Sequence, residues 1–188
     1  MAAGRRIGLQ ALPAALAADR DAAFPHLVRA LVDGVYSGAL RLTGSPADAE
    51  DITQEAFVRA YGALRSYPPE RIAALRLREW VWTIAANLCR NRARSRRRRP
   101  EEPGDGAVTV PDPAPGPEAR AVAGAERERL ATLLTRLPWA QRAAVVLRHV
   151  TGLGYTETAA ALGRPVGTVK ADVHRGLQQL RRYLEEET

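Results

Sequence analysis

The stretch Trp80–Arg99, WVWTIAANLCRNRARSRRRR, decides the fold because it joins a helical apolar stripe to a dense basic end. Apolar residues recur every three or four positions, which predicts a helix with one face against a core. That stripe consists of Leu77, Trp80 or Val81, Ile84 and Leu88. The opposite face is expected to carry Trp82, Thr83, Ala86, Asn87, Arg90 and Asn91, followed by Arg92, Arg94 and Arg96–Arg99.

This second face has the side-chain chemistry of a nucleic-acid surface. Arginine pairs with phosphates, amides read base edges, and aromatic rings stack on unpaired bases. The alternative is a core helix whose charged end is merely solvated, since runs of charge are usually soluble surface.

Composition points to an all-α chain with a polyanionic partner. Hydrophobic residues make up 46% of the 188 positions, aromatic residues only 5%, and no alternating β-branched run is present. A core of alanine, leucine and valine favours helix. The net charge of +7 favours a polyanion such as nucleic acid. Cys89 is the only cysteine, so no internal disulfide is possible and a reducing cytoplasm fits.

Upstream of the basic helix, the sequence predicts an N-terminal module over residues 19–99 after a tail or short helix at 1–18. Pro13 interrupts the weak resemblance of Ile7–Ala18 to a signal peptide, and no segment is long enough to span a membrane. Helices are expected over 19–42 and 46–64. Ser45 and Pro46 are a good N-cap and first residue for the second helix. Residues 65–74 are expected to be a loop because they contain two prolines.

The helix that begins at Pro46 carries more acid than a helix N-terminus needs. Acids in a first turn complement the helix dipole. These, however, extend over two turns and would form a docking face for a basic partner. The acidic face comprises Asp48, Glu50, Asp51, Gln54 and Glu55.

Downstream, the composition changes sharply at residues 100–118, which hold five acids, no basic residue and many prolines and glycines. This composition predicts a flexible linker. Residues 119–188 then predict a second module with short helices over 126–137, 138–150, 155–162 and 165–184. The last helix has a stripe with steps of three and four residues, namely Val166, Val169, Val173, Leu177, Leu180 and Leu184.

The last two helices form the pattern of a helix-turn-helix, joined by Gly163-Arg164-Pro165. The N-terminal residues of the second helix would enter the major groove. Its exposed face is expected to offer Thr168, Lys170, Ala171, His174, Arg175 and Gln178. An ordinary helical hairpin is the alternative.

Three segments in order resemble the extracytoplasmic-function (ECF) group of small two-domain sigma factors of bacterial RNA polymerase. GSPADAEDITQEAFVRAY at 44–61 resembles the polymerase-clamp-binding segment of that family. WVWTIAANLCRNRAR at 80–94 is similar to its promoter-melting helix. LGYTETAAALGRPVGTVKADVHRGLQQLRRYL at 153–184 is similar to its C-terminal helix-turn-helix.

The resemblance implies a promoter-specificity subunit that is not an enzyme by itself and needs no cofactor. The acidic face would dock on the clamp of core polymerase, and the flap of the large subunits is a further expected contact. The family commonly has an anti-sigma factor that masks these surfaces. A cytoplasmic location and no membrane contact of its own follow from the same resemblance.

The resemblance also implies two promoter contacts. Melted minus-ten DNA would meet a surface in which Asn87 lies near the pocket for a flipped base, gripped by the loop around Tyr67–Ala74. That surface comprises Tyr67, Trp80, Trp82, Asn87, Arg90, Asn91 and Arg94. Duplex minus-thirty-five DNA would meet Thr168, Lys170, Ala171, Asp172, His174 and Arg175.

Several residues depart from the family pattern. Thr83 and Ala86 stand where arginine is frequent, and Thr158 replaces a core aliphatic residue. Gly154 stands where a serine usually caps the helix, at a cost of at most about a few tenths of a kcal/mol. Asp172 replaces an arginine, so it either reads a cytosine amino group or points away from DNA.

Two other functions compete with this interpretation. A stand-alone helix-turn-helix regulator would explain residues 153–184 but would leave the acidic face without a role. A metal-dependent nuclease would need carboxylates that converge on one ion. The spacing of Asp48, Glu50, Asp51 and Glu55 does not bring all four together, and no histidine or cysteine assists.

Overall fold

The structure is a computed structural model that describes residues 7–98 and 129–186, with side chains described as far as Arg96 in the first range. These residues form helices and the turns between them, with no strand among them, which confirms the all-α prediction. The first range contains α1 (Leu12–Ala18), α2 (Arg20–Thr43), α3 (Pro46–Ser66), α4 (Pro69–Ala73) and α5 (Leu77–Arg98). The second contains a helical stretch at 129–136, then α7 (Trp139–Val145), a π-helical turn η1 (Val146–Val150), α8 (Tyr155–Leu162) and α9 (Val166–Glu186). The predicted linker at 100–118 lies outside the described residues.

The helix starts follow the capping chemistry of the sequence. The Asp19 carboxylate accepts from the backbone N–H of Ala22 at 3.0 Å and caps α2. The Ser45 hydroxyl accepts from the N–H of Asp48 at 3.3 Å and caps α3, whose first residue is Pro46. Between them Gly44 adopts φ +71°, a conformation that glycine reaches without strain.

Two N-terminal segments are more ordered than the sequence pattern predicted. Residues 65–74 are not a continuous loop, because α4 begins at Pro69 and buries Ile72 completely. Proline suits a first helical position since its N–H would have no helical partner there. At the N-terminus, the alternative of a short helix holds: α1 buries Leu12 and Leu16 against α2 and α4.

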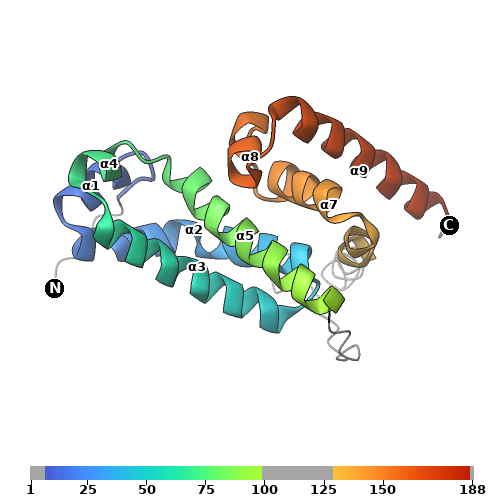
Figure 1. The fold of residues 1–188 in the computed structure, drawn as a ribbon, viewed down its shortest axis with the longest axis horizontal. Helices are drawn as coiled ribbons and strands as arrows, with labels where there is room; N and C mark the ends of the chain where they lie inside the picture. The colour runs from blue at the N-terminus through green and yellow to red at the C-terminus, as the bar shows by residue number, and fades with distance from the viewer. Residues whose placement is uncertain (1–6, 99–128, 187–188) are drawn as a thin grey trace, which may run out of the picture.

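The N-terminal module is built on α2, α3 and α5, which pack pairwise along their lengths (Figure 1). Leu27, Val35, Ile52 and Val81 are all at most 2% exposed. Each such aliphatic side chain contributes about 1.5–3 kcal/mol by its removal from water. Cys89 lies in the same core, and burial raises the pKa of its thiol to about 12, so it stays protonated as a packing residue.

The C-terminal module packs α7 and α8 against α9. Gly163, at φ +62°, ends α8 and turns the chain into α9, which gives the predicted helix-turn-helix. Val169, Val173 and Leu180 are buried as expected, but Leu184 is 39% exposed, so the predicted stripe ends too late. Beyond Leu180, the last turns of α9 lie beside the helical stretch at 129–136, where the Arg136 guanidinium lies 4.0 Å from the ring centroid of Tyr183.

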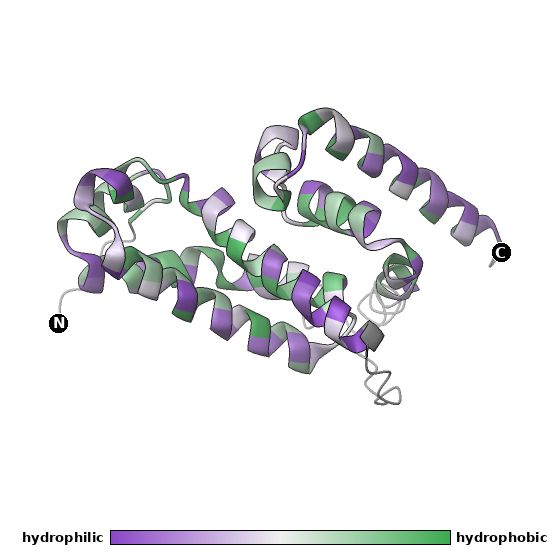
Figure 2. Cartoon of the chain, in the orientation of Figure 1, coloured by the Kyte–Doolittle hydropathy of each residue, from purple (hydrophilic) through white to green (hydrophobic). Residues whose placement is uncertain are grey.

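The two modules contact each other through α5 and α8 and through α2 and η1. In Figure 1, α7 and α8 lie between α5 and α9, so α9 is the outermost helix of the C-terminal module. Figure 2 shows that α5 is polar toward its C-terminal end and that polar and apolar residues alternate along α9.

Candidate nucleic-acid and partner interfaces

The five residues predicted to form the acidic face of α3 differ in their exposure to solvent. Glu50, Asp51, Gln54 and Glu55 are exposed on the helix surface. Asp48, which was also predicted to be a docking residue, is only 6% exposed and so is not part of the outward surface. As the third residue of α3, it faces the end of α5 rather than solvent.

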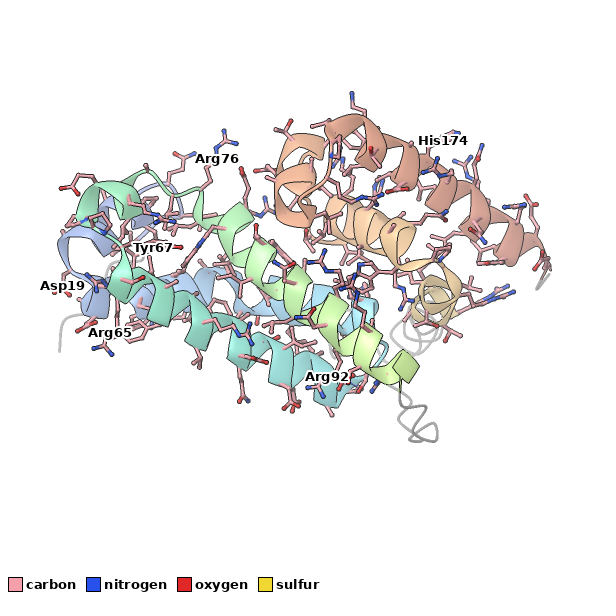
Figure 3. All side chains as sticks on the ribbon, viewed as in Figure 1. Asp19, Arg65, Tyr67, Arg76, Arg92 and His174 are labelled. Carbon is pink, nitrogen blue, oxygen red and sulfur yellow. The ribbon has the colours of Figure 1, made fainter. Side chains whose placement is uncertain are left out.

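The partners of Asp48 are arginines from the basic end of α5. Arg96 Nη2 lies 2.7 Å from Asp48 Oδ2, and Arg92 Nη1 lies 3.5 Å from Asp48 Oδ1. Arg92 also donates to Asp51 Oδ2 at 3.3 Å. Figure 3 shows Arg92 where the end of α5 meets the start of α3. Part of the arginine run is therefore anchored within the protein.

These ion pairs were missed at the sequence level, although a signal existed. Asp48 and Asp51 are three residues apart, and Arg92 and Arg96 are four apart, so each pair shares one helix face. Antiparallel packing of the two helices would bring the faces together. The sequence pattern does not report that packing, because it depends on the fold of the whole module.

An aromatic cluster lies at the opposite end of α5. The ring centroids of Tyr67 and Trp80 are 6.2 Å apart, and the Arg71 guanidinium lies 3.7 Å from the Tyr67 ring centroid. Tyr67 and Trp80 are half-buried and come from the turn before α4 and the first turn of α5. The structure thus brings together two predicted minus-ten residues and adds Arg71, which lies inside the predicted specificity loop. Rings and a guanidinium of this kind suit stacking on an unpaired base.

Asn87 lies seven residues beyond Trp80, two helical turns along the same side of α5. Arg90 Nη2 donates to Asn87 Oδ1 at 2.5 Å. Both residues line a cavity of about 280 Å³ whose other wall comes from the C-terminal module, including Trp139, Leu162 and Arg164. Asn91 and Arg94 are exposed further along the helix.

Trp82 does not share this surface, which corrects the prediction of an open second face on α5. Its side chain is 2% exposed and packs against Gly38 of α2, and Ala86 is 3% exposed. The sequence pattern could not distinguish two buried faces from one, because the second face is covered partly by α2 and partly by the module that follows the linker.

The predicted DNA-reading face of α9 is open apart from one residue. Lys170, His174 and Arg175 are exposed, and Thr168 and Ala171 are half-buried. His174 lies on the outer side of the helix (Figure 3). Lys170 Nζ lies 5.7 Å from the ring centroid of Tyr155 in α8.

Asp172 is the exception, being 3% exposed. Arg164 donates to its Oδ2, and Arg175 Nη2 donates to its Oδ1 at 2.7 Å. The carboxylate is therefore directed at two arginines of its own module, and both alternatives for its role at DNA stay predictions. Asp172 ties the turn of the helix-turn-helix to α9.

The two departures in α8 have different consequences. The Glu157 carboxylate accepts from the backbone N–H of Gly154, so the helix start is capped without a serine. Thr158 is fully buried, and its hydroxyl finds no hydrogen-bond partner among residues 7–98 and 129–186. A buried polar group without a partner costs about 1–3 kcal/mol.

The described residues offer neither a cluster of metal ligands nor a membrane-spanning helix. Within 7–98 and 129–186, no three His, Cys, Asp or Glu side chains gather closely enough to hold a metal ion. None of the helices described there has the length and apolar content to cross a bilayer.

One module is a helix-turn-helix with an exposed basic face. The other is a helical module with an acidic surface and an aromatic surface. Together these features are typical of a two-module DNA-binding protein. Residues 27–99 match Sigma-70 region 2, and residues 127–180 match Sigma-70, region 4. The chain therefore belongs to the ECF sigma factors of RNA polymerase, as its curated relatives also show.

Three relatives illustrate the similarity. The ECF RNA polymerase sigma factor SigE of Mycolicibacterium smegmatis is 39% identical over 163 residues, covering 85% of this chain and 60% of that protein. The RNA polymerase sigma-E factor of Streptomyces avermitilis is 36% identical, covering 86% and 85%. The ECF RNA polymerase sigma factor SigW of Bacillus subtilis is 32% identical, covering 89% and 91%. The chain thus spans only 60% of the length of the first of these relatives.

Solved structures show the same architecture. CnrH in complex with the cytosolic domain of CnrY is similar with a TM-score of 0.71 and 25% identity, covering 95% of this chain and 98% of that chain. The sigma factor RpoE in complex with the anti-sigma factor NepR from Bartonella quintana has a TM-score of 0.65 and 22% identity, covering 86% and 96%. The second likeness supports the fold alone.

Proposed function

We propose that this sigma factor binds core RNA polymerase through the outward acidic residues of α3 and delivers it to promoters through two DNA surfaces. The acidic docking face is defined here as Glu50, Asp51, Gln54 and Glu55. The observation that carries the proposal is that this face is exposed on one module while the basic face of α9 is exposed on the other. A stand-alone regulator has no use for the acidic face.

The docking step is electrostatic. Carboxylates in a row on an exposed helix attract a basic partner and set its register. Arg59 pairs with Glu55 at 2.5 Å and Arg92 with Asp51 at 3.3 Å, but both contacts are at the surface and worth little in free energy. A basic coiled coil of the polymerase clamp would replace them.

Promoter contact is divided between the modules. Lys170, His174 and Arg175 would meet minus-thirty-five duplex, where exposed hydrogen-bond donors contact phosphates and base edges. Tyr67, Trp80 and Asn87 would hold melted minus-ten bases by stacking and by amide hydrogen bonds. The two modules match Sigma-70 regions 2 and 4, so both are expected to act within the polymerase holoenzyme. An anti-sigma factor is a further expected partner, since RpoE of Bartonella quintana and CnrH were solved as complexes, the former with an anti-sigma factor.

The docking face is tested by co-purification with core polymerase. Glu50→Arg with Asp51→Arg should abolish binding, because two attractive charges become repulsive. Asp33→Arg with Glu185→Arg reverses two other exposed acids, on α2 and α9, and serves as the control of equal net charge. Unchanged co-purification of the first variant would contradict the assignment of α3.

A further inference from the structure

The N-terminal helix α1 is a part of the molecule to which the proposed function gives no role. It spans Leu12–Ala18, whereas the match to Sigma-70 region 2 begins at residue 27. Its two leucines, Leu12 and Leu16, are nevertheless at most 1% exposed. Burial of this extent fixes α1 firmly against the elements that cover these side chains.

The element that depends most on α1 is α4, the short helix after Tyr67. A helix of five residues is too short to be stable by itself, so its position depends on packing. Among the described elements, α4 has its most extensive contact with α1, and its residue Ile72 is fully buried. Both helices lie at the same end of the N-terminal module (Figure 1). The packing therefore seats α4 on α1.

A connection of one residue, Asp19, joins α1 to the three-helix body. The backbone N–H of Asp19 donates to the carbonyl of Ala15 at 2.9 Å, and its carboxylate accepts from the N–H of Ala22 at 3.0 Å. The same residue thus ends α1 and caps α2. Because α1 also packs against α2, it forms a fixed support between α2 and α4.

The position of α4 decides where Arg71 lies relative to the aromatic cluster. Arg71 belongs to α4, and its guanidinium lies 3.7 Å from the ring centroid of Tyr67, which is 6.2 Å from the ring centroid of Trp80. A guanidinium offers five donors and no acceptor, so it favours a stacked base that presents acceptors to it. A shift of about 1 Å would weaken such a hydrogen bond, because these bonds depend steeply on geometry.

We propose that α1, through α4, holds Arg71 over Tyr67 and thereby sets which melted promoter base this cluster prefers. This role rests on the proposed function of Tyr67 and Trp80 as contacts of melted minus-ten bases. Arg71 is the specificity-determining residue of the cluster. Leu12 and Leu16 are positioning residues, which are buried and so touch no DNA themselves.

The test uses the holoenzyme formed with purified core polymerase and a DNA probe whose duplex arm is followed by ten randomised single-stranded positions. Sequencing of the bound fraction gives the base preference at each position. Leu16→Ala shortens a positioning residue, and Leu16→Met restores most of its volume. Leu42→Ala is the matched control, because Leu42 is also fully buried in this module but lies at the end of α2 that is remote from α1. Arg71→Ala removes an exposed guanidinium and leaves the core intact.

We expect the unsubstituted holoenzyme to enrich one base within the randomised strand. Leu16→Ala and Arg71→Ala should both reduce that enrichment at least threefold at the same position, and Leu16→Met should restore it. Leu42→Ala should lower the urea midpoint as Leu16→Ala does and keep the base preference. Ile72→Val trims the α4 side of the same packing and should weaken the preference in the same direction, which keeps the test valid if Leu16→Ala does not fold.

A full base preference in folded Leu16→Ala, or in Ile72→Val if the former does not fold, would overturn the positioning role of α1 and leave the proposed function intact. An equal loss in Leu42→Ala would also overturn it, because the preference would then follow stability alone. A loss at positions that Arg71→Ala does not affect would show that α1 does not act through Arg71. No preference in the unsubstituted holoenzyme would contradict base capture by Tyr67 and Trp80, and with it the role of α1, whereas docking through α3 is measured separately by co-purification.

Discussion

At the scale of single residues, burial separates structural polar groups from functional ones. Asp48 and Asp172 read as surface charges in the sequence, yet both are buried and paired with arginines. Glu50 and His174, on the same two helices, are exposed. Residue type alone does not separate these cases, because the direction of a side chain depends on which helix packs beside it.

Thr158 is expected to limit the stability of the C-terminal module. Thr158→Val keeps the side-chain shape and removes a buried hydroxyl that has no partner, so the free energy of unfolding should rise by about 1 kcal/mol. Urea unfolding measures this, with Thr156→Val, exposed on the same helix, as the control that should change little. A loss of stability in Thr158→Val would show that the hydroxyl is bonded.

Asp172 is expected to matter for folding rather than for reading a base. Asp172→Asn takes the charged acceptor from Arg164 and Arg175, and hydrogen bonds to charged groups are worth about 1.5–3 kcal/mol. The free energy of unfolding of the C-terminal module should therefore fall by about 2 kcal/mol in thermal or urea unfolding. Glu185→Gln, exposed near the end of α9, is the control. A variant of normal stability with altered base preference would reverse this assignment and make Asp172 a reader of sequence.

At the scale of helices, the sequence predicted where most helices begin, but it predicted only some of the contacts between them. Capping residues and prolines placed the starts of α2, α3, α8 and α9 to within a residue or two. The sequence could not place α4, because a five-residue helix has too few positions to show a period. It also could not show that α5 is buried on two sides, since the covering residues of α8 are more than 60 positions away.

The pairing of α3 with α5 is expected to depend mainly on Asp48. Asp48→Asn removes a buried carboxylate between Arg92 and Arg96, whereas Asp51→Asn removes one whose side chain is 66% exposed. The loss of unfolding free energy should be about 1 kcal/mol or more for Asp48→Asn and a few tenths for Asp51→Asn, because exposed pairs contribute little. Urea unfolding at low and high salt compares them. Equal losses would mean that the ion pairs do not hold the end of α5.

At the scale of the whole molecule, the proposed function divides promoter contact between the two modules, so variants of each module should affect different steps of initiation. The sequence pattern predicted two helical modules, and the surfaces assigned to each of them stay predictions. It did not predict that they touch, because the linker composition favours separation and says nothing about contact. The roles of Asn87 and Lys170 stay predictions from the sequence, whereas the C-terminal residues that line the cavity beside Asn87 could be found only from the fold.

Asn87→Ala is expected to impair promoter opening more than duplex binding. The amide is the group proposed to hold a base that has left the stack, so its loss should reduce the rate of open-complex formation at least tenfold. Duplex affinity of the holoenzyme should change less than twofold. Permanganate footprinting measures opening, and a gel-shift assay on closed promoter duplex measures binding. Equal loss in both assays would remove Asn87 from the melted-strand site.

The most direct measurement of the central claim is run-off transcription on genomic fragments with purified core polymerase, with and without this protein. The account predicts discrete transcripts only when both are present, and their start sites would reveal the two promoter elements. The absence of such transcripts, together with sequence-specific duplex binding by the protein alone, would contradict a role in initiation and leave α9 as the reading helix of a stand-alone regulator.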